Sequence, residues 1–138
     1  IQEPNPMETV VSLHGAVIQV REITKTVSIG YGATYKIDPP ARLATVGVGY
    51  ADGYPRALSN CGHAFVAGKK VPVVGRVSMD LITLDISDIS NEHMRVGEPV
   101  ELLGTNISLD EIANHAGTIG YEILTGLGQR WSKRYIGI

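Results

Sequence analysis

The stretch Ala64-Phe65-Val66-Ala67-Gly68-Lys69-Lys70-Val71-Pro72-Val73-Val74 decides the fold class of this chain. Two short apolar runs, residues 64–67 and 71–74, are separated by a glycine and two lysines. Apolar runs on either side of a short connection that contains glycine are typical of a β-hairpin. The stretch therefore predicts two antiparallel strands joined by an exposed turn at residues 68–70.

Similar β-strand patterns continue on both sides of this hairpin. Further strands are predicted at residues 10–23 (with a bend at His14-Gly15), 26–29, 42–48, 81–86, 100–103 and 131–136. Many short strands between glycine-rich turns favour a closed sheet, because closure leaves few strand edges exposed. We therefore expect a mainly β fold, a Greek-key-like β-barrel domain with one or two short helices.

One segment has a clear helix pattern. Ser108-Leu109-Asp110-Glu111 matches a capping box, in which Ser108 caps the first turn and Glu111 reaches back to it. The helix is expected to continue to about His115 and to end at Gly117. A second, shorter helix is predicted at residues 121–125.

Length and composition indicate one folded domain. The chain has 138 residues, of which 43% are hydrophobic and 19% are charged. Its net charge of −2 argues against a nucleic-acid-binding face, and no apolar run reaches the length of a membrane span. We expect neither nucleic acid nor membrane as a partner. Cys61 is the single cysteine, which favours a reducing, cytoplasmic location.

The first residues are expected to form a linker. The opening IQEPNP contains two prolines and an asparagine, which favour extended chain. The sequence also begins without methionine and shows no signal-peptide pattern. We expect a piece of a longer protein, with residues 1–8 as linker and residues 9–138 as the domain.

Tyrosine and glycine alternate in two stretches, Gly30-Tyr31-Gly32-Ala33-Thr34-Tyr35 and Gly49-Tyr50-Ala51-Asp52-Gly53-Tyr54-Pro55-Arg56. The chain has six tyrosines and one phenylalanine, which indicates a use for phenol hydroxyls. Glycine beside tyrosine permits close approach by another molecule, so these stretches predict a wall of a small-molecule site. The alternative is a set of strand tyrosines between turn glycines. For a phenol to act as a base near neutrality its pKa must fall from about 10 towards 7, which a nearby cation favours.

A third candidate segment is Gly75-Arg76-Val77-Ser78-Met79-Asp80. Arg76 is suited to bind a carboxylate or to pair with Asp80. Met79 is interpreted either as core filler or as a ligand contact.

The histidines do not suggest a metal site. His14, His63, His93 and His115 are scattered, and none shows a metal-ligand spacing with another histidine, a cysteine or a carboxylate. No metal is therefore expected.

Four motifs together resemble the C-terminal domain of the pyridoxal-phosphate-dependent alanine racemases. They are GYGATY (30–35), GYADGYPR (49–56), GRVSMD (75–80) and IGYEILTGLGQR (119–130), and the resemblance covers about residues 10–135. It implies a β-domain preceded by an N-terminal (β/α)8 barrel, whose lysine holds pyridoxal 5'-phosphate covalently. The β-domain would cap the barrel of the second subunit of a homodimer. The implied reaction is two-base interconversion of L- and D-alanine, which supplies D-alanine for bacterial peptidoglycan; a catabolic role is the alternative.

The resemblance also implies roles for individual residues. Tyr31 matches the catalytic tyrosine that removes the α-proton of L-alanine, and Tyr121 matches the tyrosine that hydrogen-bonds the cofactor phosphate. Met79 matches the residue whose backbone helps to hold the substrate carboxylate. The implied substrate channel comprises Tyr50 as inner gate, Arg56, Arg76 and Ile119 on the wider rim, and Asp80 beside the substrate contact.

The chain has no lysine that matches the cofactor-binding motif. Its five lysines are Lys25, Lys36, Lys69, Lys70 and Lys133. We expect the isolated chain to be inactive and to bind pyridoxal phosphate weakly or not at all. The alternatives are a broad-specificity or serine racemase domain, and a non-catalytic β-barrel module for binding or dimerisation. Related decarboxylases place a cysteine at the proton-donating position, so Tyr31 favours a racemase.

Overall fold

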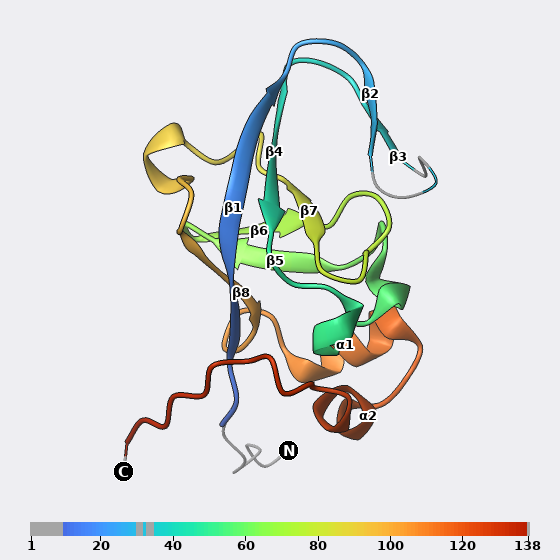
Figure 1. Ribbon diagram of the computed structural model, residues 1–138, viewed down its shortest axis with the longest axis vertical. Helices are drawn as coiled ribbons and strands as arrows, with labels where there is room; N and C mark the ends of the chain where they lie inside the picture. The colour runs from blue at the N-terminus through green and yellow to red at the C-terminus, as the bar shows by residue number, and fades with distance from the viewer. Residues whose placement is uncertain (1–9, 30–31, 33–34, 138) are drawn as a thin grey trace, which may run out of the picture.

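The computed structural model describes residues 10–29, 32 and 35–137. A six-stranded sheet curls into a nearly closed barrel, accompanied by a two-stranded ribbon and two short α-helices (Figure 1). The strands are β1 (Leu13–Ile23), β2 (Val27–Ile29), β3 (Tyr35–Ile37), β4 (Ala41–Val46), β5 (His63–Val66), β6 (Lys69–Pro72), β7 (Ile82–Asp85) and β8 (Pro99–Leu103). The helices are α1 (Leu109–Ala116) and α2 (Gly120–Thr125), with 3-10 turns η1 (Tyr50–Asp52), η2 (Arg56–Leu58) and η3 (Asn91–His93). The expected mainly β, barrel-like fold is confirmed.

The barrel is an antiparallel sheet with the strand order β6-β5-β8-β1-β4-β7. Neighbours such as β8 and β1 are far apart in sequence, as in a Greek key. Just beyond β6, Val73 forms an isolated bridge with Leu84 of β7, and the Val74 amide donates to the Thr83 carbonyl at 2.9 Å. These contacts join the two outer strands and nearly close the sheet.

The hairpin predicted from the deciding stretch is present as β5 and β6. Its turn consists of Ala67 and Gly68, with φ values of 51° and 79°. Two residues with positive φ match the twist of paired strands. Lys69 and Lys70 therefore lie in β6, not in the turn where they were expected.

The predicted first helix is confirmed at both ends. The Glu111 amide donates to Ser108 Oγ at 3.1 Å, and Gly117 ends α1 in the left-handed conformation. The Glu111 carboxylate does not complete the expected capping box; it pairs with Lys70 Nζ at 2.8 Å. The second helix is also confirmed, as α2.

The strand predicted at residues 131–136 is wrong. This segment is irregular, and the side chains of Tyr135 and Ile136 are 76% and 80% exposed. A strand needs a free sheet edge to pair with, and the outer strands β6 and β7 are already bridged to each other.

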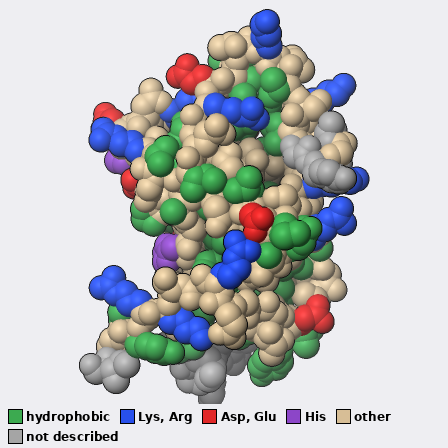
Figure 2. Space-filling view, in the orientation of Figure 1, with side chains coloured by type: hydrophobic (Ala, Val, Ile, Leu, Met, Phe, Trp, Pro, Cys, Tyr) green, Lys and Arg blue, Asp and Glu red, His purple; other side chains and the backbone are tan. Residues whose placement is uncertain are grey.

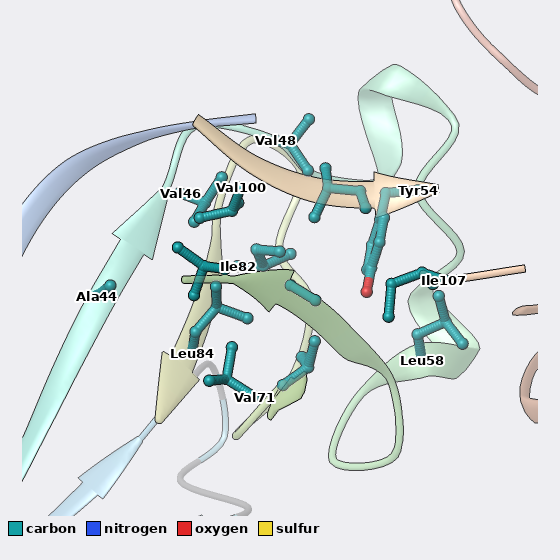
Figure 3. Packing of buried hydrophobic residues seen from close by; sticks show 14 of the residues in the cluster. Ala44, Val46, Val48, Tyr54, Leu58, Val71, Ile82, Leu84, Val100 and Ile107 are labelled. Atoms are coloured by element: carbon teal, nitrogen blue, oxygen red, sulfur yellow. The ribbon is translucent and has the colours of Figure 1, made fainter. Parts of the chain in front are cut away.

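Two hydrophobic cores of unequal size fill the molecule. The larger lies inside the barrel and includes Val46, Ile82, Leu84 and Val100 from three strands (Figure 3). The smaller lies beneath the β2–β3 ribbon and consists of Ile23, Ile29, Ile37, Ala41, Leu43 and Val74. Burial of each such aliphatic side chain contributes about 1.5–3 kcal/mol, so the barrel holds most of the hydrophobic stabilisation.

Across the described ranges 10–29, 32 and 35–137, the helices are too short or too polar to cross a membrane.

Candidate functional site

Three of the four sequence motifs meet at one place on the barrel. The amides of Tyr50 and Ala51 donate to the carbonyls of Ser78 at 3.0 Å and Met79 at 2.9 Å. On the other side, the Gly128 amide donates to the Asp52 carbonyl at 3.1 Å. The GYADGYPR motif is thus held between GRVSMD and the end of IGYEILTGLGQR. We call this place the motif junction and define it as residues 49–54, 78–81 and 126–131.

The glycines of GYADGYPR are required by this packing. A Cβ atom at Gly49 would collide with the carbonyl oxygens of Ser78 and Met79. Gly53 has φ of 91°, and a Cβ atom there would collide with the Gly126 carbonyl. Only glycine allows the three backbones to approach this closely. Tyr50 consequently lies in a 3-10 turn, which excludes the strand alternative for this tyrosine.

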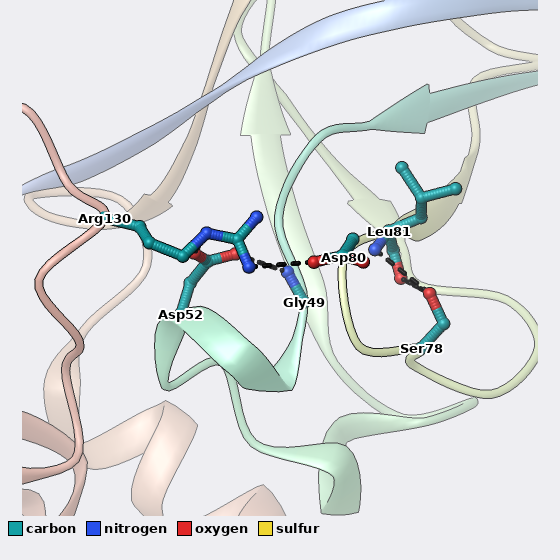
Figure 4. Close-up of polar contacts among 6 residues, drawn as sticks. All are labelled: Gly49, Asp52, Ser78, Asp80, Leu81 and Arg130. Atoms are coloured by element: carbon teal, nitrogen blue, oxygen red, sulfur yellow. Dashed lines mark hydrogen bonds and ion pairs between the residues drawn. The ribbon is translucent and has the colours of Figure 1, made fainter.

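A carboxylate network holds the motif junction together (Figure 4). Asp52 is only 5% exposed; its Oδ2 accepts from the Gly49 amide at 3.0 Å, and its Oδ1 lies 3.1 Å from Arg130 Nε. Arg130 Nη1 also binds Asp80 Oδ1 at 2.8 Å. The Asp80 hydrogen bond and the charge of Asp52 raise the pKa of Arg130, so the cation persists between its two acids.

This network corrects the sequence analysis. Asp80 pairs with Arg130, so the alternative in which Arg76 is its partner is wrong. Neither Asp52 nor Arg130 was singled out from the sequence. Both stand inside the motifs, but the two positions are 78 residues apart in the sequence, and no local pattern relates them.

The outer side of the motif junction is apolar and exposed. Tyr50, Met79 and Leu81 are 44%, 53% and 40% exposed, so the interpretation of Met79 as core filler is wrong. In the face of the molecule drawn in Figure 2, exposed hydrophobic side chains lie among acidic and basic ones. Exposed apolar groups set on a rigid turn indicate a surface that meets a ligand or another protein surface.

Arg76 connects the motif junction to the first tyrosine motif. A Cβ atom at Gly32, whose φ is 78°, would lie 3.0 Å from Arg76 Nη1. The neighbouring Gly75 has φ of 77° and lies against Ile29, at the end of β2. The guanidinium of Arg76 therefore lies beside residue 32 of GYGATY. Tyr31, the predicted catalytic residue, lies outside the described residues.

Arg56 is placed on the segment next to Arg76. Ser59 Oγ donates to the Arg56 carbonyl at 2.6 Å and accepts from the Val77 amide at 2.8 Å. The Asn60 amide also donates to the Gly75 carbonyl at 3.2 Å. Both arginines are exposed, so the two predicted rim cations lie on adjacent segments.

Ile119 and Tyr121 lie at the start of α2 and are 64% and 79% exposed. The chain around α2 contacts Gly53 through Gly126 and Leu127, which follow the other end of this helix. Ile119 and Tyr121 are thus exposed to solvent on a neighbouring element. Among the residues that the structure describes, no hydrogen bond joins them to Tyr50 or Met79.

The expectation for the histidines needs revision. One potential ligand atom from each of His63, Glu111 and His115 lies within 4.8 Å of the other two. Glu111 and His115 stand four residues apart on α1, which puts both on one helix face. This spacing is visible in the sequence and could have indicated the pair. His63 comes from β5 and was not predictable from local spacing.

The fold and the motif junction define a β-barrel domain that presents three of its sequence motifs together at its surface. Residues 10–135 match the family model described as alanine racemase, C-terminal domain. The chain belongs to this family.

Individual relatives agree with the family match. An alanine racemase of Rhodospirillum rubrum is 51% identical over 97% of this chain, and a catabolic alanine racemase of Agrobacterium fabrum is 50% identical over 96%. The crystal structure of alanine racemase from Bartonella henselae with covalently bound pyridoxal phosphate superimposes with a TM-score of 0.92. It is 39% identical, and the match covers 98% of this chain and 37% of that one. The chain spans about a third of the length of the curated relatives, 36% and 34% for the two named.

Proposed function

We propose that this chain forms one wall of the active site of an alanine racemase, which interconverts L- and D-alanine with pyridoxal 5'-phosphate. The observation that carries the proposal is the motif junction, which presents Tyr50 and Met79 on a rigid base beside Arg76. Family membership supports the reaction, and the Bartonella henselae structure with covalently bound pyridoxal phosphate supports the cofactor.

The residues of this chain are suited to contact the cofactor, but they do not provide the lysine that would bind it covalently. The exposed Tyr121 hydroxyl is free to donate to a phosphate oxygen. No lysine occurs in the motif junction as defined, and Lys70 is paired with Glu111. We therefore place the attaching lysine on an N-terminal (β/α)8 barrel, with residues 1–8 as linker and 9–138 as the β-domain. Pyridoxal phosphate, when bound, supplies an electron sink that makes the α-hydrogen of an amino acid acidic.

Tyr31 is the proposed base for the α-proton of L-alanine. A neutral phenol is a poor base, and a nearby cation favours its ionised form. The Arg76 guanidinium beside Gly32 brings positive charge to the residue next to Tyr31 in the chain. The base for the opposite face would come from outside this chain.

The substrate carboxylate is proposed to meet the backbone at Met79. A carboxylate accepts hydrogen bonds, so the donor would be the Met79 amide, and the hydrogen bond from the Tyr50 amide to the Ser78 carbonyl fixes the Ser78–Met79 peptide. Arg56 and Arg76 on the rim attract an anion, while Arg130 offsets one of the two negative charges of Asp52 and Asp80. Tyr50 and Ile119 would supply the apolar walls of the channel, with Tyr50 as its inner gate.

The exposed apolar side of the motif junction also supports the expected assembly. We propose that it faces the barrel of a second subunit, so that the active site is completed in a homodimer. Named relatives are described both as alanine racemase and as catabolic alanine racemase, so the proposal concerns the reaction and not its metabolic direction.

The test follows solvent deuterium entering L- and D-alanine in the intact protein. We expect Tyr31→Phe to slow exchange from L-alanine by about 100-fold or more, because general base catalysis contributes at least that much, and to affect D-alanine less. Tyr135→Phe, an exposed tyrosine outside the motifs, is the matched control and should exchange both enantiomers normally. Near-normal exchange from both enantiomers in Tyr31→Phe would refute the role of this residue.

A further inference from the structure

His63, Glu111 and His115 form a cluster between the barrel and its first helix, which we call the histidine cluster. Their potential ligand atoms lie within 4.8 Å of one another, and the two imidazole centroids are 5.8 Å apart with an angle of 45° between the rings. His63 is the first residue of β5, whereas Glu111 and His115 are on α1. The cluster thus brings together residues from two elements that are separate in sequence.

His63 has unused hydrogen-bonding capacity. Its Nδ1 atom is buried and has no hydrogen-bond partner among the residues that the structure describes. A buried polar atom without a partner is unfavourable, and its presence calls for a physical explanation. An additional group that binds at this imidazole would provide one.

We propose that the histidine cluster binds a divalent transition-metal ion, for which Zn²⁺ is the best-fitting probe. Two imidazoles and one carboxylate are ligands that zinc accepts, whereas magnesium and calcium prefer oxygen ligands alone. Tetrahedral zinc with bonds of about 2.0–2.1 Å needs its ligand atoms about 3.4 Å apart. The ligand atoms lie within 4.8 Å of one another, so binding would require small side-chain rotations, for which the exposed His115 on α1 has room.

Lys70 pairs with the carboxylate of the histidine cluster. Its Nζ atom lies 2.8 Å from Glu111 Oε1, and its side chain is 48% exposed. The ammonium already offsets the Glu111 charge, and its exposure lets it move into solvent when a metal ion binds. Lys70 therefore acts as a competitor, and its removal should strengthen metal binding.

The bound ion would join β5 to α1. Because an ion that binds the folded chain and not the unfolded chain stabilises the fold, zinc should raise the melting temperature. This stabilisation should depend on His63, Glu111 and His115 together.

The experiment is a zinc titration of the intact protein, stripped of metal and free of any histidine tag, by calorimetry and thermal melting. We expect one zinc ion per chain at this site, and at least about a tenfold loss of affinity in His115→Gln, which removes an exposed side chain and should fold normally. His93→Gln, an exposed histidine on η3, is the matched control and should bind like the wild type. Lys70→Gln should bind more tightly.

Two results would overturn the proposal. One is the absence of zinc-dependent heat and melting shift in the wild-type protein. The other is equal zinc affinity for the wild type, His115→Gln and His63→Gln, which would place any bound zinc elsewhere.

Discussion

The barrel and the β2–β3 ribbon are both antiparallel sheets, but they are held in different ways. The barrel has a large core and joined outer strands, while the ribbon rests on a core of six residues. The two tyrosine motifs differ in the same way, because GYADGYPR packs on the barrel and GYGATY runs into β3 of the ribbon at Tyr35. GYADGYPR is fixed to the barrel by buried Asp52 and by backbone contacts with two other segments. Of GYGATY, the structure describes Gly32, which lies beside Arg76, and Tyr35, the first residue of β3. The smaller core leads us to expect lower local stability for β2 and β3 than for the barrel strands.

The largest expected effect comes from truncating a side chain in the barrel core, and the same kind of truncation in the smaller core provides its comparison. Leu84 is fully buried in the barrel, and Leu84→Ala should lower the free energy of unfolding by about 3–4 kcal/mol through lost burial and a cavity. Ile37→Ala in the smaller core should cost about 2 kcal/mol and should mainly speed amide exchange in β2 and β3. Urea unfolding and hydrogen exchange measure the two effects. Uniformly faster exchange in Ile37→Ala would show that the two cores unfold as one.

The next effect tests how closely the motif junction is packed. Gly53→Ala should cost about 3 kcal/mol, because alanine is strained at positive φ and its Cβ would collide with the Gly126 carbonyl. Gly97→Ala is the matched control, since Gly97 has φ of 94° but no atom within 4 Å of the added Cβ. It should cost only about 1 kcal/mol in the same urea titration. Equal losses for both variants would mean that backbone conformation alone explains these glycines.

The smallest effect concerns Tyr54 in the barrel core. Its hydroxyl is buried without a hydrogen-bond partner among the described residues, which is unfavourable, so Tyr54→Phe should leave the free energy of unfolding unchanged or raise it by up to about 1 kcal/mol at neutral pH. Burial, and secondarily the charge of Cys61, raise the pKa of Tyr54 in the folded state. Ionisation in the unfolded state should therefore cost stability as the pH rises above about 10, the ordinary pKa of tyrosine.

Tyr54→Phe should lose this part of the alkaline destabilisation, as measured by urea unfolding across that pH range. Tyr135→Phe, at an exposed position, should keep the wild-type profile. If Tyr54→Phe also kept it, the buried phenol would not be the group responsible.

Much of the fold could be predicted because its signals are local. Two short apolar runs on either side of Gly68 identified the hairpin of β5 and β6, and Ser108 and Gly117 marked the ends of α1. The final strand at 131–136 was wrong because strand formation depends on a free edge elsewhere in the molecule, which residue patterns do not report.

The candidate site could be predicted only as a set of motifs. That Asp52 binds Arg130, and that His63 meets Glu111 and His115, are consequences of barrel closure over long sequence separations. The family resemblance predicts Tyr50, Met79 and Asp80 as site residues, but it does not indicate that Arg130 is the partner of Asp80. That pairing depends on how the segments of the motif junction pack against one another in the folded chain.

Trp131 gives this domain a built-in optical reporter. It is the chain's one tryptophan, half-buried, and its indole Nε1 donates to the Asp52 carbonyl at 2.8 Å. Intrinsic fluorescence excited at this indole therefore senses the environment of η1 and not an average over the chain. A shift in its emission would register any loosening of the turn that carries Tyr50, without a label and on the time scale of a mixing experiment.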